Sequence, residues 1–446
     1  MEKGQHVAVV GGGLAGLAAS IYLARGGKSV TVFERSQSWG GRAATQIHDG
    51  FRFNLGPHAM YRGGEAMQVL RELGITVNGK RPPGEGLAIR DDGSHKLPAS
   101  FLSLATTTLL DGSAKVEAAM LLQKLRWRKS SVSDTLSVRE WLDQQIHNPD
   151  VRLLVEALIR LSTYCDEPDL QSAGAAVRQL QSAVRRGVLY VDEGWQTLVD
   201  GLRAAAVSSG VNFVSNSKVV AVNEEGGTVR GIELGGLQSD EDLENSVGQS
   251  RLTREQPIGS IGASIKTDVV LLAIAPAAAA KLVPDSGTLR DAATTLTPIH
   301  ASSLDVALSE LPRAETIFAL GLHQPLYLSV HSATARLAPG KGAMLHVMKY
   351  LRSGDKSAPE EELEGFLEEM QPGWRERVVS KRFLPKLVVS NGVVTAAGSG
   401  FAGRPPVAVA DIENLYVAGD WVGSEGMLAN ASLASARKAA RTILSS

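Results

Sequence analysis

The chain has 446 residues, 43% of them apolar and 21% charged, and a formal net charge of −1. This length predicts two domains with sizeable cores, and the near-zero charge gives no reason to expect a nucleic acid as partner. The single cysteine, Cys165, excludes disulfides within the chain and cysteine-based metal clusters. We expect a cytoplasmic protein, because no apolar run is long enough to span a bilayer and the first strand begins too early to leave room for a signal peptide.

A glycine-rich turn between a strand and a helix opens the chain. An apolar run from His6 to Val10 predicts a buried strand, and a helical pattern runs from Leu14 to about Arg25. Glycines at G-x-G-x-x-G spacing join the two, permitting a tight turn, close approach of a pyrophosphate and close packing of helix on strand. The helix N-terminus adds free N–H groups and the positive end of its dipole. The residues expected to hold a dinucleotide here are Gly11, Gly13, Leu14, Ala15 and Gly16.

An acidic residue follows the next expected strand, Val30 to Phe33. Glu34 comes 18 residues after Gly16 and suits a ribose diol, while it would repel a 2′-phosphate. A second glycine pair, ending at Gly41, lets more backbone approach the pyrophosphate, and Arg42 can neutralise it through two parallel hydrogen bonds. A fold that binds only nicotinamide has no need of this second segment. The cofactor residues expected in this stretch are Glu34, Arg35, Gly41 and Arg42.

A compact turn at residues 53–61 contains Gly56-Pro57, flanked by Asn54, His58 and Tyr61. With this turn, the chain resembles the flavin-containing amine oxidase superfamily, which includes phytoene-desaturase-like and protoporphyrinogen-oxidase-like enzymes. The resemblance implies that a loop of this turn lies against the isoalloxazine ring of the cofactor, and that the backbone at Val219 holds its adenine end. The residues of that loop are Leu55, Gly56, Pro57 and His58.

The stretch from residue 66 to residue 184 is predicted to be mainly helical. The expected elements are a helix over Ala66 to Leu73, strand-like pieces at 87–89 and 96–97, and helices at 138–142, 151–161 and 173–184. An apolar segment from Phe101 to Trp127 ends in the basic residues Lys124, Arg126, Arg128 and Lys129. Two interpretations of this segment stay open: peripheral contact with a membrane surface, or an amphipathic element within the substrate domain.

The chain then returns to the nucleotide-binding domain at residues 190–195. A helix from Gln196 to Ser208 is followed by strands at 211–214, 218–223 and 228–234. Residues 236–258 are polar and lack periodicity, so we predict a mobile surface loop there. The next buried strand is expected at 268–274, and Pro276 is expected to begin a helix.

A second sheet is predicted between residues 297 and 404, with strands at 304–308, 326–330, 345–350 and 387–389 and a helix at 359–370. Alternation places Tyr327, Ser329 and His331 on one face of their strand, and His346, Met348 and Tyr350 share a face of another. Such faces could line a substrate pocket over the flavin, but a solvent-facing surface would give the same pattern. The pocket candidates are Tyr327, His331, His346, Tyr350 and Trp421.

A buried strand near Asn414 ends in Gly419 and Asp420, and a helix runs from Met427 to about Ile443. Gly419 lets the backbone approach the cofactor, Asp420 can accept a hydrogen bond from its ribityl or phosphate end, and the helix N-terminus can stabilise charge at the N1–C2=O edge of reduced flavin. This second segment indicates FAD. No cysteine lies near it, so we expect non-covalent FAD, contacted here by Gly419, Asp420, Met427 and Leu428.

The predicted fold is α/β: a Rossmann-type FAD-binding domain with an inserted α+β substrate domain, made of a helical part and a second mixed sheet. The FAD-binding domain is expected to comprise residues 1–77, 188–280 and 408–446, and the substrate domain residues 78–187 and 281–407.

The favoured function is an FAD-dependent oxidoreductase that dehydrogenates or desaturates a largely apolar, isoprenoid-like small molecule by hydride transfer to flavin N5. His58 and Tyr61 are the catalytic candidates, although His58 could only brace its loop and Tyr61 could be core. Two alternatives stay open: a flavin amine oxidase, with an aromatic pair drawn from Trp421, Tyr350 and Tyr327, and a non-redox FAD-dependent isomerase or binding protein. No metal motif is visible, and the oligomeric state is left open.

Overall fold

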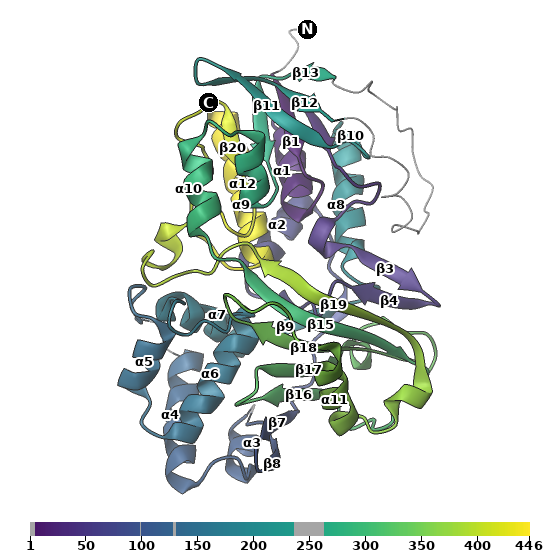
Figure 1. Ribbon diagram of the computed structural model, residues 1–446, viewed down its shortest axis with the longest axis vertical. Coiled ribbons are helices and arrows are strands. Elements are labelled where there is room, and N and C mark those ends of the chain that lie inside the picture. The colour runs from purple at the N-terminus through teal and green to yellow at the C-terminus, as the bar shows by residue number, and fades with distance from the viewer. Residues whose placement is uncertain (1–4, 99, 128–130, 236–262) are drawn as a thin grey trace.

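The computed structural model describes residues 5–98, 100–127, 131–235 and 263–446. A five-stranded parallel sheet organises the upper lobe in Figure 1, which also holds both chain ends. Its strand order is β10-β2-β1-β14-β20. The strands are β1 (His6–Val10), β2 (Ser29–Phe33), β10 (Asn212–Val214), β14 (Val269–Leu272) and β20 (Leu415–Val417). Strands from near both ends of the chain therefore lie in one sheet.

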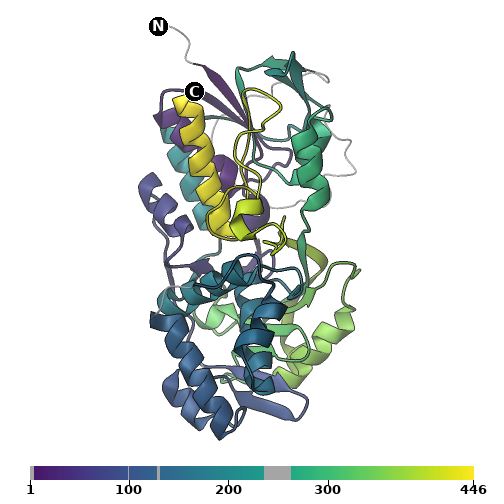
Figure 2. The ribbon, with the colours of Figure 1, turned by 90° about the vertical axis from the view of Figure 1, so that its left-hand side faces the viewer.

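Layers of other elements cover both faces of this sheet. Four helices lie on one side: α1 (Leu14–Arg25), α2 (Glu65–Leu73), α8 (Gln196–Ser208) and α12 (Ala429–Ser445). Helices α1 and α12 pack against each other, as Figure 2 shows. The other side carries an antiparallel sheet of β11 (Val219–Glu225), β12 (Thr228–Leu234) and β13 (Ser264–Lys266), with α9 (Pro276–Leu282) and α10 (Gly287–Thr295). Because both faces are covered, β14 is a continuous apolar run with no exposed residue.

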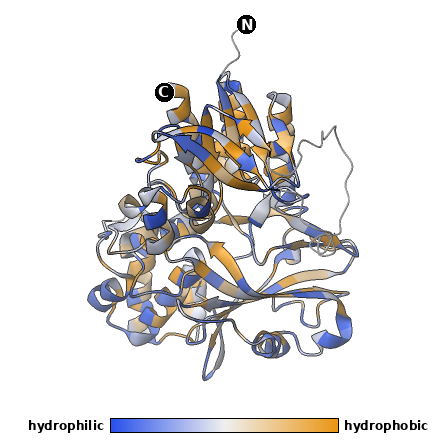
Figure 3. Cartoon of the chain, turned by 45° about the horizontal axis from the view of Figure 1, so that its top comes forward, coloured by the Kyte–Doolittle hydropathy of each residue, from blue (hydrophilic) through white to orange (hydrophobic). Residues whose placement is uncertain are grey.

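A seven-stranded sheet organises the lower lobe, in the order β19-β15-β18-β17-β16-β7-β8. Its strands are β7 (Leu87–Arg90), β8 (Gly93–Lys96), β15 (Ile299–Leu308), β16 (Phe318–Gly321), β17 (Leu326–Val330), β18 (Ala343–Leu351) and β19 (Val378–Ser390). All neighbours are antiparallel except β16 and β7. One face packs against α11 (Glu360–Met370) in an apolar core. Figure 3 shows hydrophobic residues along the strands of both lobes.

Five helices complete the lower lobe and share a second apolar core. They are α3 (Phe101–Thr106), α4 (Gly112–Trp127), α5 (Val138–Gln145), α6 (Pro149–Thr163) and α7 (Ala173–Arg186). The segment 101–127 divides into two helices because the backbone at Thr107 is extended and ends the first one. Asp111 then precedes the second helix, and its carboxylate accepts the Ala114 N–H at 2.9 Å. Ser137 begins α5 with a capping box to Glu140.

Short strands join the two lobes: β3 (Thr45–His48) pairs with β4 (Phe51–Asn54), and β9 (Val188–Val191) pairs with β5 (Met60–Tyr61) and β6 (Gly79–Lys80). The chain thus passes between the lobes several times, although the exact limits of the domains stay a prediction. The loop expected at 236–258 and the basic residues Arg128 and Lys129 lie outside the described residues. Among the helices that are described, none has the length and apolar character needed to span a membrane.

Candidate functional site

The glycine-rich turn after β1 has the geometry that its spacing predicts. Gly11 has φ +108°, and its N–H donates to Phe33 O at 2.8 Å. A Cβ at Gly16 would lie 2.0 Å from Gly11 O, so only glycine fits there. Helix α1 begins after Gly13 with no side-chain cap and no acidic residue in its first turn. Leu14 and Ala15 lie in the first turn of the helix, where backbone N–H groups have no acceptor within the helix. Because this turn is buried, these N–H groups suit an anionic ligand.

The second glycine pair lies directly opposite this turn. Gly40 forms a parallel bridge with Gly13, and its N–H donates to Gly12 O at 2.9 Å. A Cβ at Gly13 would have Gly40 O as its nearest neighbour at 3.8 Å, and one at Gly41 would have Gly13 Cα at 3.9 Å. Two backbone segments without side chains therefore lie side by side, and the open space beside their glycines is the kind of gap that a diphosphate cradle requires.

Glu34 lies beside this gap at the end of β2. Its carboxylate accepts the N–H groups of Gly12 at 2.8 Å and Ser36 at 2.9 Å, which fixes its position. The backbone of Glu34 accepts the Ser217 N–H at 2.9 Å, two residues before Val219 at the start of β11. Arg35 is exposed. Glu34, the expected ribose acceptor, and Val219, the expected adenine contact, are thus held near each other.

Arg42 connects the two ends of the chain. Its guanidinium donates to both carboxylate oxygens of Asp420, at 2.9 and 3.0 Å, and Asn391 donates to the same carboxylate through its backbone and its side chain. Burial alone would raise the pKa of Asp420, but Arg42 and Asn391 outweigh it and hold the pKa at about 2. The carboxylate therefore stays charged and fixes the turn after β20 against the turn after β2.

The start of α12 is a second helix N-terminus without a side-chain cap. Leu428 precedes it with φ +55° and ψ −129°, a conformation that costs a non-glycine residue on the order of 1–3 kcal/mol. Met427 is buried, and Gly419 donates its N–H to Ser435 Oγ at 2.9 Å. Arg404, which the sequence did not single out, donates to Asp420 O at 3.3 Å, and burial lowers its pKa to about 10.

The loop from Leu55 to His58 lies between the two lobes. His58 has one ring nitrogen 3.0 Å from Gly56 O and the other 3.1 Å from Arg42 O, and its ring packs edge-on against Trp195. Tyr61 donates its hydroxyl to Ser162 O at 2.6 Å. Both catalytic candidates are therefore hydrogen-bonded to backbone carbonyls. This geometry fits the two non-catalytic roles, in which His58 braces its loop and Tyr61 is part of the core.

One face of the seven-stranded sheet turns toward this loop. The strand register pairs Asp305 of β15 with His346 of β18, and His346 with Ser329 of β17. The next pairs along the same face are Ser303 with Met348, Met348 with Tyr327, and Ala301 with Tyr350. We call the side chains of these residues, with His331 just beyond β17, the inner face. All are buried, so the solvent-facing alternative is wrong.

Two further tyrosines, which the sequence did not single out, close over the inner face. Tyr190 of β9 stacks on His331 with ring centroids 3.8 Å apart, and its hydroxyl lies 3.1 Å from Ser329 Oγ. Tyr164, which ends α6 with φ +60°, lies with its hydroxyl 3.3 Å from Pro57 O. The inner face is thus linked to the loop at Pro57 by a side chain from the helical part.

Trp421 is not brought to the inner face. It is fully buried in the core of the upper lobe, where its indole N–H donates to Ile274 O at 3.0 Å. Tyr327, His331, His346 and Tyr350 do lie together. We therefore leave Trp421 out of the proposed substrate site.

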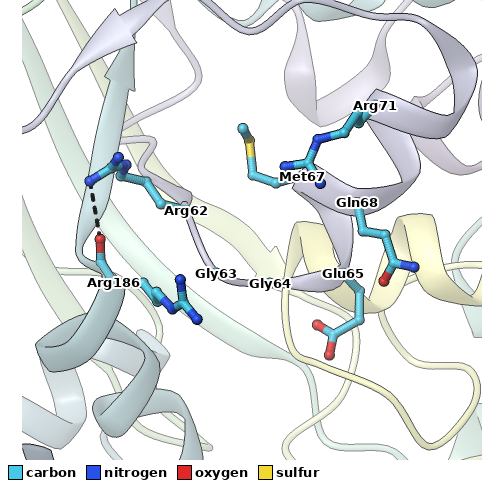
Figure 4. Close-up of a pocket in the computed structure, with 8 residues that line it drawn as sticks. All are labelled: Arg62, Gly63, Gly64, Glu65, Met67, Gln68, Arg71 and Arg186. Atoms are coloured by element: carbon cyan, nitrogen blue, oxygen red, sulfur yellow. Dashed lines mark hydrogen bonds between the residues drawn. The ribbon is translucent and has the colours of Figure 1, made fainter.

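A separate surface hollow of about 310 Å³ lies beside the N-terminus of α2 (Figure 4). It is lined by Arg62, Gly63, Gly64, Glu65, Met67, Gln68, Arg71 and Arg186. Its three arginines are exposed, and none of its residues belongs to the glycine-rich turns or to the inner face.

The chain belongs to the family of flavin-containing amine oxidoreductases, whose model matches residues 14–444. It is therefore a flavoprotein of the oxidoreductase class, and its cofactor is FAD.

Sequence relatives include protoporphyrinogen oxidase 2 of Arabidopsis thaliana, 29% identical over 37% of this chain and 34% of the relative. Phytoene desaturase of Cercospora nicotianae is 25% identical over 51% of this chain and 42% of the relative. The matched stretches span less than half the length of the curated relatives. A solved putrescine oxidase matches the fold with a TM-score of 0.69 at 16% identity, covering 99% of both chains.

The residues present fit FAD. The open space beside Gly13 and Gly41 suits a diphosphate, and the two uncapped helix N-termini, at α1 and at α12, offer N–H groups to negative charge. Glu34 can accept hydrogen bonds from ribose hydroxyl groups, while Asp420, whose oxygens already accept from Arg42 and Asn391, holds the turn after β20 in place. FAD supplies a hydride acceptor at N5 of its ring when bound.

Proposed function

We propose that the chain dehydrogenates or desaturates a largely apolar small molecule, using FAD as the hydride acceptor. The observation that carries this proposal is the chemistry of the inner face. Tyr327, Met348 and Tyr350 form one apolar cluster with Ala301, and Tyr164, Leu161 and Phe318 pack against it. Such a surface binds a hydrophobic or conjugated body through dispersion and ring contacts.

The charge balance of the inner face supports an uncharged substrate. Its one carboxylate, Asp305, is paired with Arg382 at 2.6 Å and with His346 at 2.7 Å. Burial raises the pKa of Asp305, but these two partners outweigh it and the pKa is lowered. Asp305 is thus already compensated, and an ammonium ion entering here would meet no free carboxylate from the described strands β15, β17 and β18.

The chain's own residues would bind and orient the substrate. The ring of Tyr164 lies 6.4 Å from that of Tyr350; Tyr350 is buried and Tyr164 is partly buried. The reacting carbon of a substrate held by these rings near the loop at Pro57 would be fixed relative to the flavin. Water excluded from this site could not take part in side reactions. The names of the desaturase and protoporphyrinogen oxidase relatives support a substrate that gains conjugated double bonds.

Amine oxidation is the second candidate, and the same Tyr164–Tyr350 pair favours it, because two aromatic rings can hold an amine nitrogen between them. The fold shared with putrescine oxidase is compatible with this candidate.

Anaerobic mixing of the FAD-loaded protein with phytoene, protoporphyrinogen and putrescine tests the choice. We expect phytoene, a pure hydrocarbon, or protoporphyrinogen, whose tetrapyrrole body is apolar, to bleach the flavin absorbance and putrescine to leave it unchanged. Bleaching by putrescine alone would establish the amine oxidase. An unbleached flavin with a product of unchanged oxidation state, measured by mass, would establish an isomerase.

We propose further that α3 and α4 contact a membrane surface from which such a substrate is collected. Val116, Met120 and Trp127 lie on one side of α4 and are 55, 58 and 73% exposed, and Leu102 of α3 is 77% exposed. Exposed apolar residues next to Lys124 and Arg126 suit an anionic bilayer. Sedimentation with vesicles of phosphatidylglycerol should deplete the wild type, and the double variant Met120→Glu, Trp127→Glu should stay in solution. Equal depletion of both would contradict the proposal.

A further inference from the structure

The inner face holds an unusual concentration of buried polar atoms that have no partner. Within the described residues, His346 Nε2, His331 Nδ1 and the Tyr350 hydroxyl are all buried and form no hydrogen bond within the protein. A buried polar atom without a partner costs on the order of 1–3 kcal/mol, so three on one sheet face call for a ligand or a chemical role.

His346 differs from the other two because its second ring nitrogen is firmly held. Its Nδ1 lies 2.7 Å from Asp305 Oδ1, which also accepts the Ser303 hydroxyl at 2.9 Å. The other oxygen of Asp305 accepts Arg382 at 2.6 Å and 3.2 Å, through Nη2 and Nε, and the Gly56 N–H at 3.4 Å. An ionised carboxylate only accepts hydrogen bonds, so Nδ1 of His346 carries the proton. When only this nitrogen is protonated, the lone pair of the ring lies on Nε2, the atom without a partner.

The position of this pair places it next to the flavin loop. Asp305 accepts from Gly56 in that loop, and Arg382, which binds Asp305, also donates to Asn54 O. The ring of His346 lies 4.7 Å from that of His331 and pairs in register with Ser329. The same loop is the one that the family resemblance sets against the isoalloxazine ring.

The other candidates are less suited to accept a proton. His58 has both ring nitrogens against carbonyl oxygens. No carboxylate among the described residues pairs with His331, and burial together with the nearby His346 and His58 lowers its pKa well below the usual value. The tyrosine hydroxyls are donors, and burial raises the pKa of Tyr350 and of Tyr61.

We propose that His346 is a catalytic residue whose Nε2 accepts the proton that leaves the substrate, with Asp305 as its positioning residue. The substrate is oxidised by two electrons: one C–H bond breaks and its hydrogen leaves with both electrons to the oxidised flavin, and the adjacent C–H or N–H bond breaks with its electrons closing the new double bond. The released proton forms the new N–H bond at Nε2, and Asp305 stabilises the resulting imidazolium. This inference rests on the proposed function.

The first test reads the histidine itself, in FAD-loaded protein labelled with ¹⁵N-histidine. We expect the wild type to show neutral His346 protonated at Nδ1, with a strongly downfield Nδ1 proton, and the assignment to be confirmed by loss of that signal in His346→Gln. In Asp305→Asn the Nδ1 preference should be lost. A neutral wild-type ring protonated at Nε2, or a tautomer unchanged in Asp305→Asn, would overturn the inference whatever the substrate proves to be.

The second test measures anaerobic flavin reduction by whichever compound of the panel above bleaches the wild type. His346→Gln should lower the limiting rate about 10²-fold to 10⁴-fold while the substrate concentration at half-maximal rate changes little. Asp305→Asn should lower it by roughly tenfold or more. The matched control is His95→Gln, because His95 also pairs with an aspartate, Asp92, at 3.0 Å. His95 lies on β8, away from the site, so this variant should react like the wild type.

The two proposals fail differently. No bleaching by any compound in the wild type would count against the proposed function, and the tautomer measurement would still decide the role of His346. Bleaching in the wild type and an equal limiting rate in His346→Gln would overturn the inference alone.

Discussion

The two large sheets of the molecule build their halves of the site in different ways. At the edge of the parallel sheet, the cofactor would meet backbone: glycines at which an added Cβ would have no neighbour closer than 3.8 Å, and two uncapped helix N-termini. On the seven-stranded sheet, the substrate would meet side chains, because the face opposite α11 carries Tyr, His, Met and Asp from three strands. The first kind of site is fixed by local chain geometry, and the second only by the register between strands.

The seven-stranded sheet repeats this contrast between its own two faces. Leu304, Leu328 and Leu345 lie on the face that α11 closes and share one apolar core with that helix. The inner face alternates with it residue by residue along the same strands. Stability should therefore depend on one face and chemistry on the other.

The largest effect is expected from the closed face. Leu345→Ala should cost about 2–5 kcal/mol of unfolding free energy, because Leu345 is fully buried and leaves a cavity against α11. Urea unfolding measures this loss, and the affinity for FAD should stay that of the wild type. A variant that loses FAD without losing stability would break the proposed division between the faces.

A slightly smaller effect is expected at the cofactor edge. Gly13→Val should weaken FAD binding at least a hundredfold, about 2.7 kcal/mol, because its side chain would fill the gap opposite Gly41. The fold should survive, since Gly13 has an ordinary φ of −80°. Fluorescence titration with FAD gives the affinity, and Gly365→Ala in α11, with nothing within 4 Å of its Cβ, is the control. Unchanged affinity would place the diphosphate elsewhere.

The smallest effect concerns the connection between the two ends of the chain. The pKa of Asp420 is about 2 in the folded protein, below its ordinary value, so its charge stabilises the fold above about pH 4 and this contribution is lost as the pH falls toward 2. It amounts to on the order of 2 kcal/mol. Asp420→Asn should lose stability at neutral pH and lack this part of the acid dependence.

Urea unfolding at several pH values, with the exposed Asp291→Asn as control, measures the difference. Parallel pH curves for wild type and Asp420→Asn would contradict the role assigned to the Arg42 pair.

The elements around the cofactor were predictable because their signals are local. The strand His6–Val10 and the helix Leu14–Arg25 have the expected bounds, since a glycine turn and an apolar run define them within a few residues. The family resemblance, the flavin and the oxidoreductase class are confirmed by the family match.

The substrate side was less predictable because its contacts join distant residues. Asp305 and His346 are 41 residues apart, and Asp305 and Arg382 are 77 apart. The one signal available in the sequence was Asp305 itself, a charged residue between Leu304 and Val306 in an apolar strand. Trp421 was misplaced because its position after Asp420 does not reveal that the next turn directs it toward Ile274 in the core.

A crystal structure of the FAD complex tests the account most directly. We expect the diphosphate beside Gly13 and Gly41, and the isoalloxazine ring against the loop at Pro57, with N5 on the side of His346 Nε2. An isoalloxazine ring lying away from Asp305 and His346, or a diphosphate bound at the arginines of the surface hollow, would contradict it.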